Sequence, residues 1–144
     1  MDSIVARPFI KWVGGKTQLL PELTKVIESM YDFAPIDKYV EPFIGGGALF
    51  FWLCSHKQIK SAVISDINED LILAYKTVQH HHHELIKSLQ VLEAQYFASE
   101  SEALREVMFY EIRKLYNQEK IEFNYGHVDT ELAVSRVAKF IFLN

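Results

Sequence analysis

Glycine and proline are distributed very unevenly along this chain of 144 residues. All four prolines lie within the first 42 positions, and five of the six glycines form two clusters, at 14–15 and 45–47. Between Ala48 and Tyr125 there is neither residue type. Because these two residues interrupt regular structure more strongly than any others, the uninterrupted stretch predicts successive helices joined by polar turns. The second half of the chain should therefore be mainly helical.

The first half alternates between short apolar segments and helical patterns. Residues 38–43, KYVEPF, are typical of a strand, and the glycines at 45–47 separate them from the helical run ALFFWL. Residues 61–66, SAVISD, form a second strand-like segment, and Glu69 and Asp70 suit the start of a helix. This order favours parallel strands with crossover helices, because a hairpin cannot join a parallel pair.

Two further helices are expected near the end of the chain. Ser99 and Glu102 have the spacing of a capping box. The inward stripe of the helix they open would consist of Leu104, Met108, Ile112 and Leu115. Asp129 or Thr130 should open the last helix, with an inward face formed by Ala133, Val137, Phe140 and Ile141.

The chain stops within an apolar run, FIFLN, with no capping glycine after it. Only two strands are recognisable, and a two-stranded parallel sheet buries too little apolar surface to be stable by itself. Both features lead us to expect a chain cut before its natural end.

Charge and composition narrow the function classes. Fifteen Lys and Arg residues against nineteen Asp and Glu residues give a net charge of −4, so any contact with nucleic acid must be local. A single cysteine excludes an internal disulfide framework, and neither a leader nor a long apolar span is apparent. We therefore expect a cytoplasmic protein with no membrane partner. The histidine run at 80–83 is expected to be a solvated helix start rather than a metal site.

The glycines at 45–47 and Asp66 carry the clearest chemical signal. A glycine loop between a strand and a helix lets the backbone approach a ligand closely, and the helix start offers unpaired N–H groups. Asp66 follows the next strand, where a carboxylate in an α/β nucleotide site accepts hydrogen bonds from ribose hydroxyls. An adenosine-containing ligand is one interpretation. A tight turn capped by Asp66, with no ligand, is the other.

The glycine pair at 14–15, within KWVGGKT, does not complete a phosphate-binding loop. Ile10 stands where that motif requires its first glycine. The simple alternative is a surface turn with a solvated Lys16. Trp12 argues against it, because an indole is rarely placed beside a turn unless its ring covers something.

Three ordered segments carry a family resemblance: RPFIKWVGGKTQLL, YVEPFIGGGALFFWL and SAVISDINEDLILAYKTV. In order and spacing they resemble the Dam-like DNA adenine methyltransferases, and ELAVSRVAKFIFLN at the end resembles a further segment of that family. The resemblance implies S-adenosylmethionine as cofactor and duplex DNA as partner, in a bacterial or phage setting. It also implies methylation of the exocyclic amine of adenine.

The same resemblance assigns provisional roles to residues. Lys16 would pair with the methionine carboxylate of the cofactor, and Trp12 would cover its sulfonium. Asp66 would hold the ribose and Ile67 would touch the adenine. The remaining pocket wall would be formed by Phe43, Ile44, Gly45 and Gly47.

DNA contacts are expected from four basic residues, Lys11, Arg113, Lys114 and Lys120. Each has a simpler alternative, a solvated lysine beside Trp12 or cations at a helix end. The family's catalytic tetrapeptide, Asp-Pro-Pro-Tyr, does not occur in this sequence, so no catalytic residue is assigned. This chain alone should lack methyl transfer.

The resulting fold class is α/β: an incomplete Rossmann-like methyltransferase core at 1–78, followed at 79–144 by a helical part of the target-recognition domain, truncated. One rival is a non-catalytic module that folds as a homodimer or with a second chain, such as the missing C-terminal half. A weaker rival is a fragment of an NAD-binding oxidoreductase.

Overall fold

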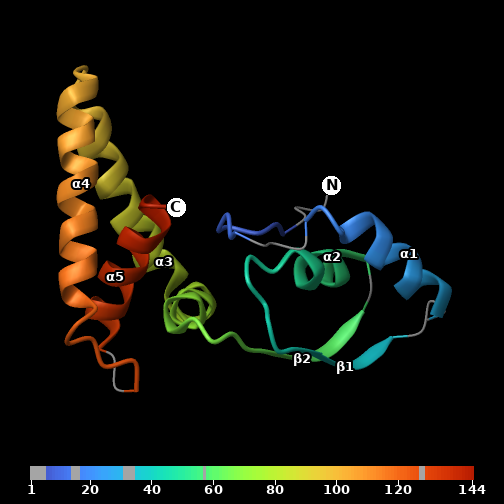
Figure 1. Cartoon of the computed structure of the whole chain (residues 1–144). Helices are drawn as coiled ribbons and strands as arrows, with labels where there is room; N and C mark the ends of the chain where they lie inside the picture. The colour runs from blue at the N-terminus through green and yellow to red at the C-terminus, as the bar shows by residue number, and fades with distance from the viewer. Residues whose placement is uncertain (1–5, 14–16, 31–34, 57, 127–128) are drawn as a thin grey trace. The chain divides into compact units, whose positions relative to one another are not determined.

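The computed structural model in Figure 1 describes residues 6–13, 17–30, 35–56, 58–126 and 129–144. The chain divides into two units, Met1–Ile67 and Asn68–Asn144. This division precedes helix α3 (Glu69–Phe97), whereas the sequence-based boundary after residue 78 falls inside that helix. The first turn of α3 already belongs to the helical unit, because Asp70 there pairs with Arg136.

The first unit contains a small parallel sheet. Strand β1 (Ile36–Glu41) pairs with β2 (Ile59–Ile64), and the register places Glu41 opposite Ile64. Helix α2 (Ala48–His56) crosses between them, and α1 (Leu20–Met30) precedes β1. The expected order of strand, helix and parallel strand is confirmed. A sheet of this kind with flanking helices is consistent with a methyltransferase-like α/β fold.

The core of the first unit forms where the N-terminal segment meets α2 and the glycine loop. Ile10, Ile44 and Leu53 are buried there. Phe9 packs edge-on against Phe51 of α2, with ring centroids 6.5 Å apart. The N-terminal segment is thereby anchored to α2, the helix that follows the glycine loop at 45–47.

The second unit consists of α3, α4 (Glu102–Glu119) and α5 (Thr130–Phe142), with α5 packed against both of the other helices (Figure 1). The prediction for α5 is confirmed: the Asp129 side chain caps it by accepting from the Glu131 N–H, and Val137 is fully buried. Among the described residues, no helix is both long and apolar enough to cross a membrane.

The prediction for the start of α4 is wrong, because Ser101 rather than Ser99 precedes the helix and the expected capping box does not form. The prediction for its inward face is confirmed in part. Ile112 is buried, whereas Leu104 and Leu115 are 60% and 51% exposed. The contacts with α5 come from two aromatic residues beside Ile112 instead: Phe109 contacts Phe142, and Tyr116 stacks on Phe140.

The histidine run at 80–83 lies inside α3 rather than at a helix start. His81 has non-helical backbone angles, φ −136° and ψ 33°, so the helix is kinked there. The acidic start predicted for this helix is confirmed by Glu69 and Asp70 in its first turn, and the Asn68 side chain accepts from the Leu71 N–H.

A buried ion pair joins α3 to α5. Arg136 donates from Nε to Asp70 Oδ1 over 2.7 Å and from a terminal nitrogen to Asp70 Oδ2 over 3.1 Å. The two side chains are only 1% and 5% exposed. The Tyr125 hydroxyl also donates to Asp70 Oδ1, over 2.8 Å, and a further Arg136 nitrogen donates to the Tyr116 carbonyl. The charges are thus buried but fully hydrogen bonded.

Burial alone would raise the pKa of Asp70, but hydrogen bonds from Arg136 and two tyrosines outweigh it and hold that pKa below its usual range. The pKa of Tyr125 is raised to about 12, by burial and by its hydrogen bond to Asp70. Because Asp70 binds its proton less readily in the folded chain than in the unfolded one, its contribution to stability is present at neutral pH. It disappears as the pH falls through the folded pKa.

We predict that Asp70→Asn lowers the free energy of unfolding at pH 7 by about 3 to 5 kcal/mol, because it leaves a buried guanidinium uncompensated. The difference between wild type and variant should begin to shrink below about pH 4, where the carboxylate of the unfolded wild-type chain takes up a proton. It should go on shrinking as the pH falls toward the lower pKa of the folded chain. Urea titrations followed by circular dichroism at several pH values measure it. A difference that is the same at pH 7 and at about pH 2.5 would contradict the ionised pair.

Candidate functional site

The candidate site lies at the edge of the sheet where both strands end. Since Glu41 and Ile64 pair in register, the loop after β1 and the turn after β2 leave the sheet side by side. Backbone bonds extend this pairing, with the Ser65 N–H donating to the Glu41 carbonyl and the Ile44 N–H donating to the Ser65 carbonyl. Phe43 and Asp66 are thus carried to the same edge.

Backbone geometry and Asp66 together fix the conformation of the glycine loop, residues 45–47. Gly45 and Gly47 have positive φ values of 51° and 77°, which side chains disfavour. The Gly45 N–H donates to Asp66 Oδ2 over 3.0 Å. The Gly47 N–H donates to the Ile44 carbonyl over 2.8 Å, which closes the turn into α2. Asp66 therefore fixes the loop as well as presenting a carboxylate beside it.

Trp12 packs directly on this loop. A Cβ added at Gly45 would lie 3.4 Å from Trp12 Cδ1. At Gly46 a Cβ would lie 3.0 Å from the Ile10 carbonyl oxygen and 3.6 Å from Trp12 Cβ. The glycines thus make room for the N-terminal segment, and the indole and the carboxylate both contact one three-residue loop.

Large apolar side chains that neighbour the glycine loop, Asp66 and Trp12 in the sequence are exposed. Phe43 is 69% exposed, Ile67 94% and Val13 98%. Exposed apolar residues are ordinary when scattered, but these flank a single loop and strand edge. Such a surface suits a flat, weakly polar ring such as adenine.

Ile44 and Lys16 are two further residues expected to contact the cofactor. Ile44 is only 2% exposed, so its side chain supports the loop from the interior and does not line an open wall. Its expected place in the cofactor pocket stays a prediction. Lys16, with Gly14 and Gly15, lies outside the described residues.

The four basic residues expected to contact DNA are all exposed. Lys11 lies in the first unit, beside Trp12. Arg113 and Lys114 lie in the last turns of α4, and Lys120 follows its end. Acidic residues occur in the same stretch, among them Glu119, which accepts from Lys139 Nζ over 2.6 Å. The helix end therefore carries mixed charge rather than a basic patch.

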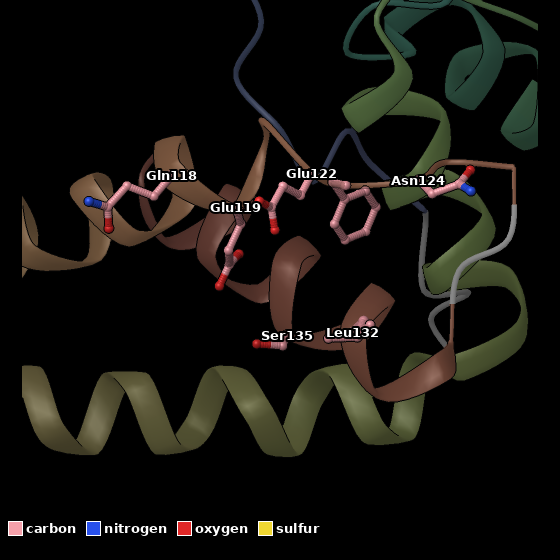
Figure 2. Close-up of a pocket in the computed structure, with 7 residues that line it drawn as sticks. Gln118, Glu119, Glu122, Asn124, Leu132 and Ser135 are labelled. Atoms are coloured by element: carbon pink, nitrogen blue, oxygen red, sulfur yellow. The ribbon is translucent and has the colours of Figure 1, made fainter.

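A hollow of about 420 Å³ in the second unit lies beside this helix end. Figure 2 shows it bordered by polar side chains and by Leu132, and Phe123 also lines it. Glu119 and Glu122 are its charged members, with Gln118, Asn124 and Ser135 as further polar ones. An acidic lining does not suit a phosphate group, so this hollow is not a site for the DNA backbone.

Sequence reasoning missed two buried carboxylates. Asp70, expected only as a helix-starting acid, forms the ion pair with Arg136. Glu41 is 5% exposed and accepts from the Tyr39 hydroxyl over 2.7 Å. Burial and this hydrogen bond raise the pKa of Tyr39. A charged residue at the last position of an apolar strand is the signal that would have identified Glu41.

Comparisons with known proteins agree with this geometry. The sequence model of the D12 class N6 adenine-specific DNA methyltransferase family matches residues 12–144. The type II methyltransferase M.MjaIII of Methanocaldococcus jannaschii is 39% identical over 138 residues, covering 96% of this chain and 45% of that protein. The DNA adenine methylase of Escherichia coli K12 is 26% identical over 138 residues, covering 96% and 40%.

A third relative, the type II methyltransferase M1.LlaDCHI of Lactococcus lactis, is 43% identical over 88 residues, covering 61% of this chain and 28% of that protein. The chain spans less than half the length of these three relatives. The resemblance drawn from the three ordered motifs is confirmed, and the alternative of a non-catalytic pairing module is not favoured. The chain belongs to the D12 class N6 adenine-specific DNA methyltransferase family.

Proposed function

We propose that this chain is the cofactor-binding part of an enzyme that methylates the exocyclic amine of adenine in duplex DNA. The observation that carries the proposal is the arrangement of Asp66, the glycine loop and Trp12 in one unit. When bound, S-adenosylmethionine would supply the activated methyl group. The chain's own residues would bind and orient this cofactor.

Each described residue at the site offers an interaction that an adenosyl group can use. Asp66 offers carboxylate oxygens to the ribose hydroxyls, while one of them also holds the Gly45 N–H. The indole of Trp12 offers an electron-rich face to a sulfonium. Phe43 and Ile67 offer exposed apolar surface to the adenine ring. Lys16 is assigned to the cofactor carboxylate by the family resemblance.

The proposal also concerns what these 144 residues do not contain. Transfer to a weakly nucleophilic amine requires acceptors for its N–H groups and an aromatic surface for the flipped base. No Asp-Pro-Pro-Tyr segment occurs in the sequence. We therefore assign to this chain cofactor binding without methyl transfer. The catalytic segment would come from a longer form of the polypeptide or from a second polypeptide.

Duplex DNA is the proposed partner. Lys11, Arg113, Lys114 and Lys120 would contact phosphates, and such contacts position a protein without reading sequence. With a net charge of −4 and acidic residues beside α4, these contacts must act locally, so affinity should depend strongly on ionic strength.

We predict that the chain binds S-adenosylmethionine weakly and that Asp66→Asn lowers the affinity by about tenfold or more, because a charge-assisted hydrogen bond is lost. Gly46→Ala should also weaken binding, because its Cβ would lie 3.0 Å from the Ile10 carbonyl oxygen and would push away the segment that carries Trp12. Isothermal titration calorimetry measures both effects.

Asp37→Asn is the matched control, because it makes the same change on β1 at an exposed carboxylate that pairs with Lys60. Equal affinity in Asp66→Asn and wild type, or tight binding of NADH, would contradict the assignment.

We predict that Lys120→Ala and Lys114→Ala each weaken duplex binding uniformly across sequences, and that each lowers the slope of log affinity against log salt by about 0.9. Fluorescence anisotropy with labelled duplexes at several salt concentrations provides the measurement. Lys87→Ala, an exposed lysine on α3, is the control. If the salt slope fell equally in Lys87→Ala, Lys114 and Lys120 would not be specific parts of the DNA interface.

We predict that the chain alone transfers no methyl group from tritiated cofactor to DNA. Mixing it with a polypeptide that carries an Asp-Pro-Pro-Tyr segment, taken from the remaining part of a relative, should restore transfer. Methylation by the purified chain itself would show that another group replaces the missing segment.

A further inference from the structure

We propose that Asp70 and Arg136 are positioning residues: their ion pair fixes the connection that follows α4, residues 120–126, and with it the direction in which Lys120 meets a DNA phosphate. The part concerning DNA rests on the proposed function. The part concerning the connection does not, since it follows from contacts within the second unit.

The first argument is the convergence of the connection on the ion pair. The Arg136 guanidinium carbon lies 4.3 Å from the ring centroid of Tyr116 and 4.8 Å from that of Phe123. The hydroxyl of Tyr125 donates to Asp70. Tyr116 lies in the last turn of α4, and Phe123 and Tyr125 lie within the segment 120–126. The pair therefore contacts the end of α4 and two residues of the connection.

Burial of the Asp70 and Arg136 charges has a large cost in free energy. Removing two charges from water costs several kcal/mol for each ion, and a well-packed apolar pair often stabilises a fold equally well. What an apolar pair cannot supply is direction. A guanidinium is planar and offers its donors in a fixed fork, so its two bonds to Asp70 set the plane in which the rings stack. The pair is thus suited to positioning more than to stabilising.

In the part of the chain that the structure describes, the connection is largely exposed. Lys120, Ile121 and Glu122 are exposed, and Ile121 is 83% exposed despite being apolar. Within it, the Ile121 and Glu122 N–H groups donate to carbonyls of the last turn of α4, and the Gly126 N–H donates to Asn124 Oδ1. Lys120 is the C-cap of α4, and Arg136 holds the last turn of this helix through the Tyr116 carbonyl and ring. The direction of Lys120 therefore follows from how this turn and the segment after it are held.

The test separates positioning from stability. In the double variant Asp70→Leu/Arg136→Met the pair is replaced by apolar side chains, which should keep the helices folded. Arg136→Lys keeps the charge but loses the planar fork. Tyr125→Phe keeps the ring and removes only one hydrogen bond, so it stays folded even if the others do not. Amide hydrogen exchange by NMR would be measured in all three and in wild type.

We expect exchange of the Ile121, Glu122 and Gly126 amides to rise about tenfold or more in the double variant and in Arg136→Lys, and by less in Tyr125→Phe. Amides within α3 and α5 should change little in Tyr125→Phe and in any variant that folds. Unchanged exchange in the connection of Tyr125→Phe and of any other folded variant would overturn the proposal. So would an equal rise throughout the unit, which indicates a purely stabilising pair.

A second measurement addresses the DNA part. Anisotropy with a duplex should show weaker binding in Tyr125→Phe, no further loss when Lys120→Ala is added to it, and unchanged affinity for S-adenosylmethionine. If wild type binds no duplex, the DNA part fails with the proposed function, while the exchange result still decides whether the ion pair orders the connection. If Lys120→Ala has its full effect in the Tyr125→Phe background, the link between the pair and Lys120 is wrong.

Discussion

The hydrogen bond from the Gly45 N–H to the Asp66 carboxylate determines the candidate site, because it joins the ends of two parallel strands through one loop. The register of the sheet brings these ends together, and the positive φ values at Gly45 and Gly47 let the loop turn back on itself. The absence of a Cβ at Gly46 leaves room for the N-terminal segment that carries Trp12. Together with the backbone bonds between Ile44, Ser65 and Glu41, this bond holds the indole and the carboxylate at one loop.

The helical unit depends on a different carboxylate, only four positions further along the sequence. Asp66 accepts from a backbone amide in the first unit, and Asp70 accepts from Arg136 and Tyr125 in the second. Each acid orders a segment through hydrogen bonds rather than through apolar packing. A short stretch around the start of α3 thus contributes to the order of both units, which explains why it contains several acids among apolar residues.

Local patterns predicted local structure well. Apolar runs ended by proline or aspartate identified both parallel strands, and Asp129 identified the cap of α5. The start of α4 was predicted wrongly, because Ser99 and Ser101 offer similar signals and only tertiary contacts choose between them. The partnership of Asp70 and Arg136 spans 66 positions, and each residue taken alone resembles an ordinary solvated helix residue. Position in the fold, not residue type, made them a buried pair.

The most direct test of the account follows the two indole N–H signals in a ¹⁵N-labelled chain during titration with S-adenosylmethionine. Trp12 contacts the glycine loop, whereas Trp52 stacks on His56 of α2 and serves as the internal reference. The account predicts that the Trp12 signal, assigned with Trp12→Phe, shifts progressively while that of Trp52 stays in place. A Trp12 signal that remains still at saturating cofactor, or a shift confined to Trp52, would contradict it.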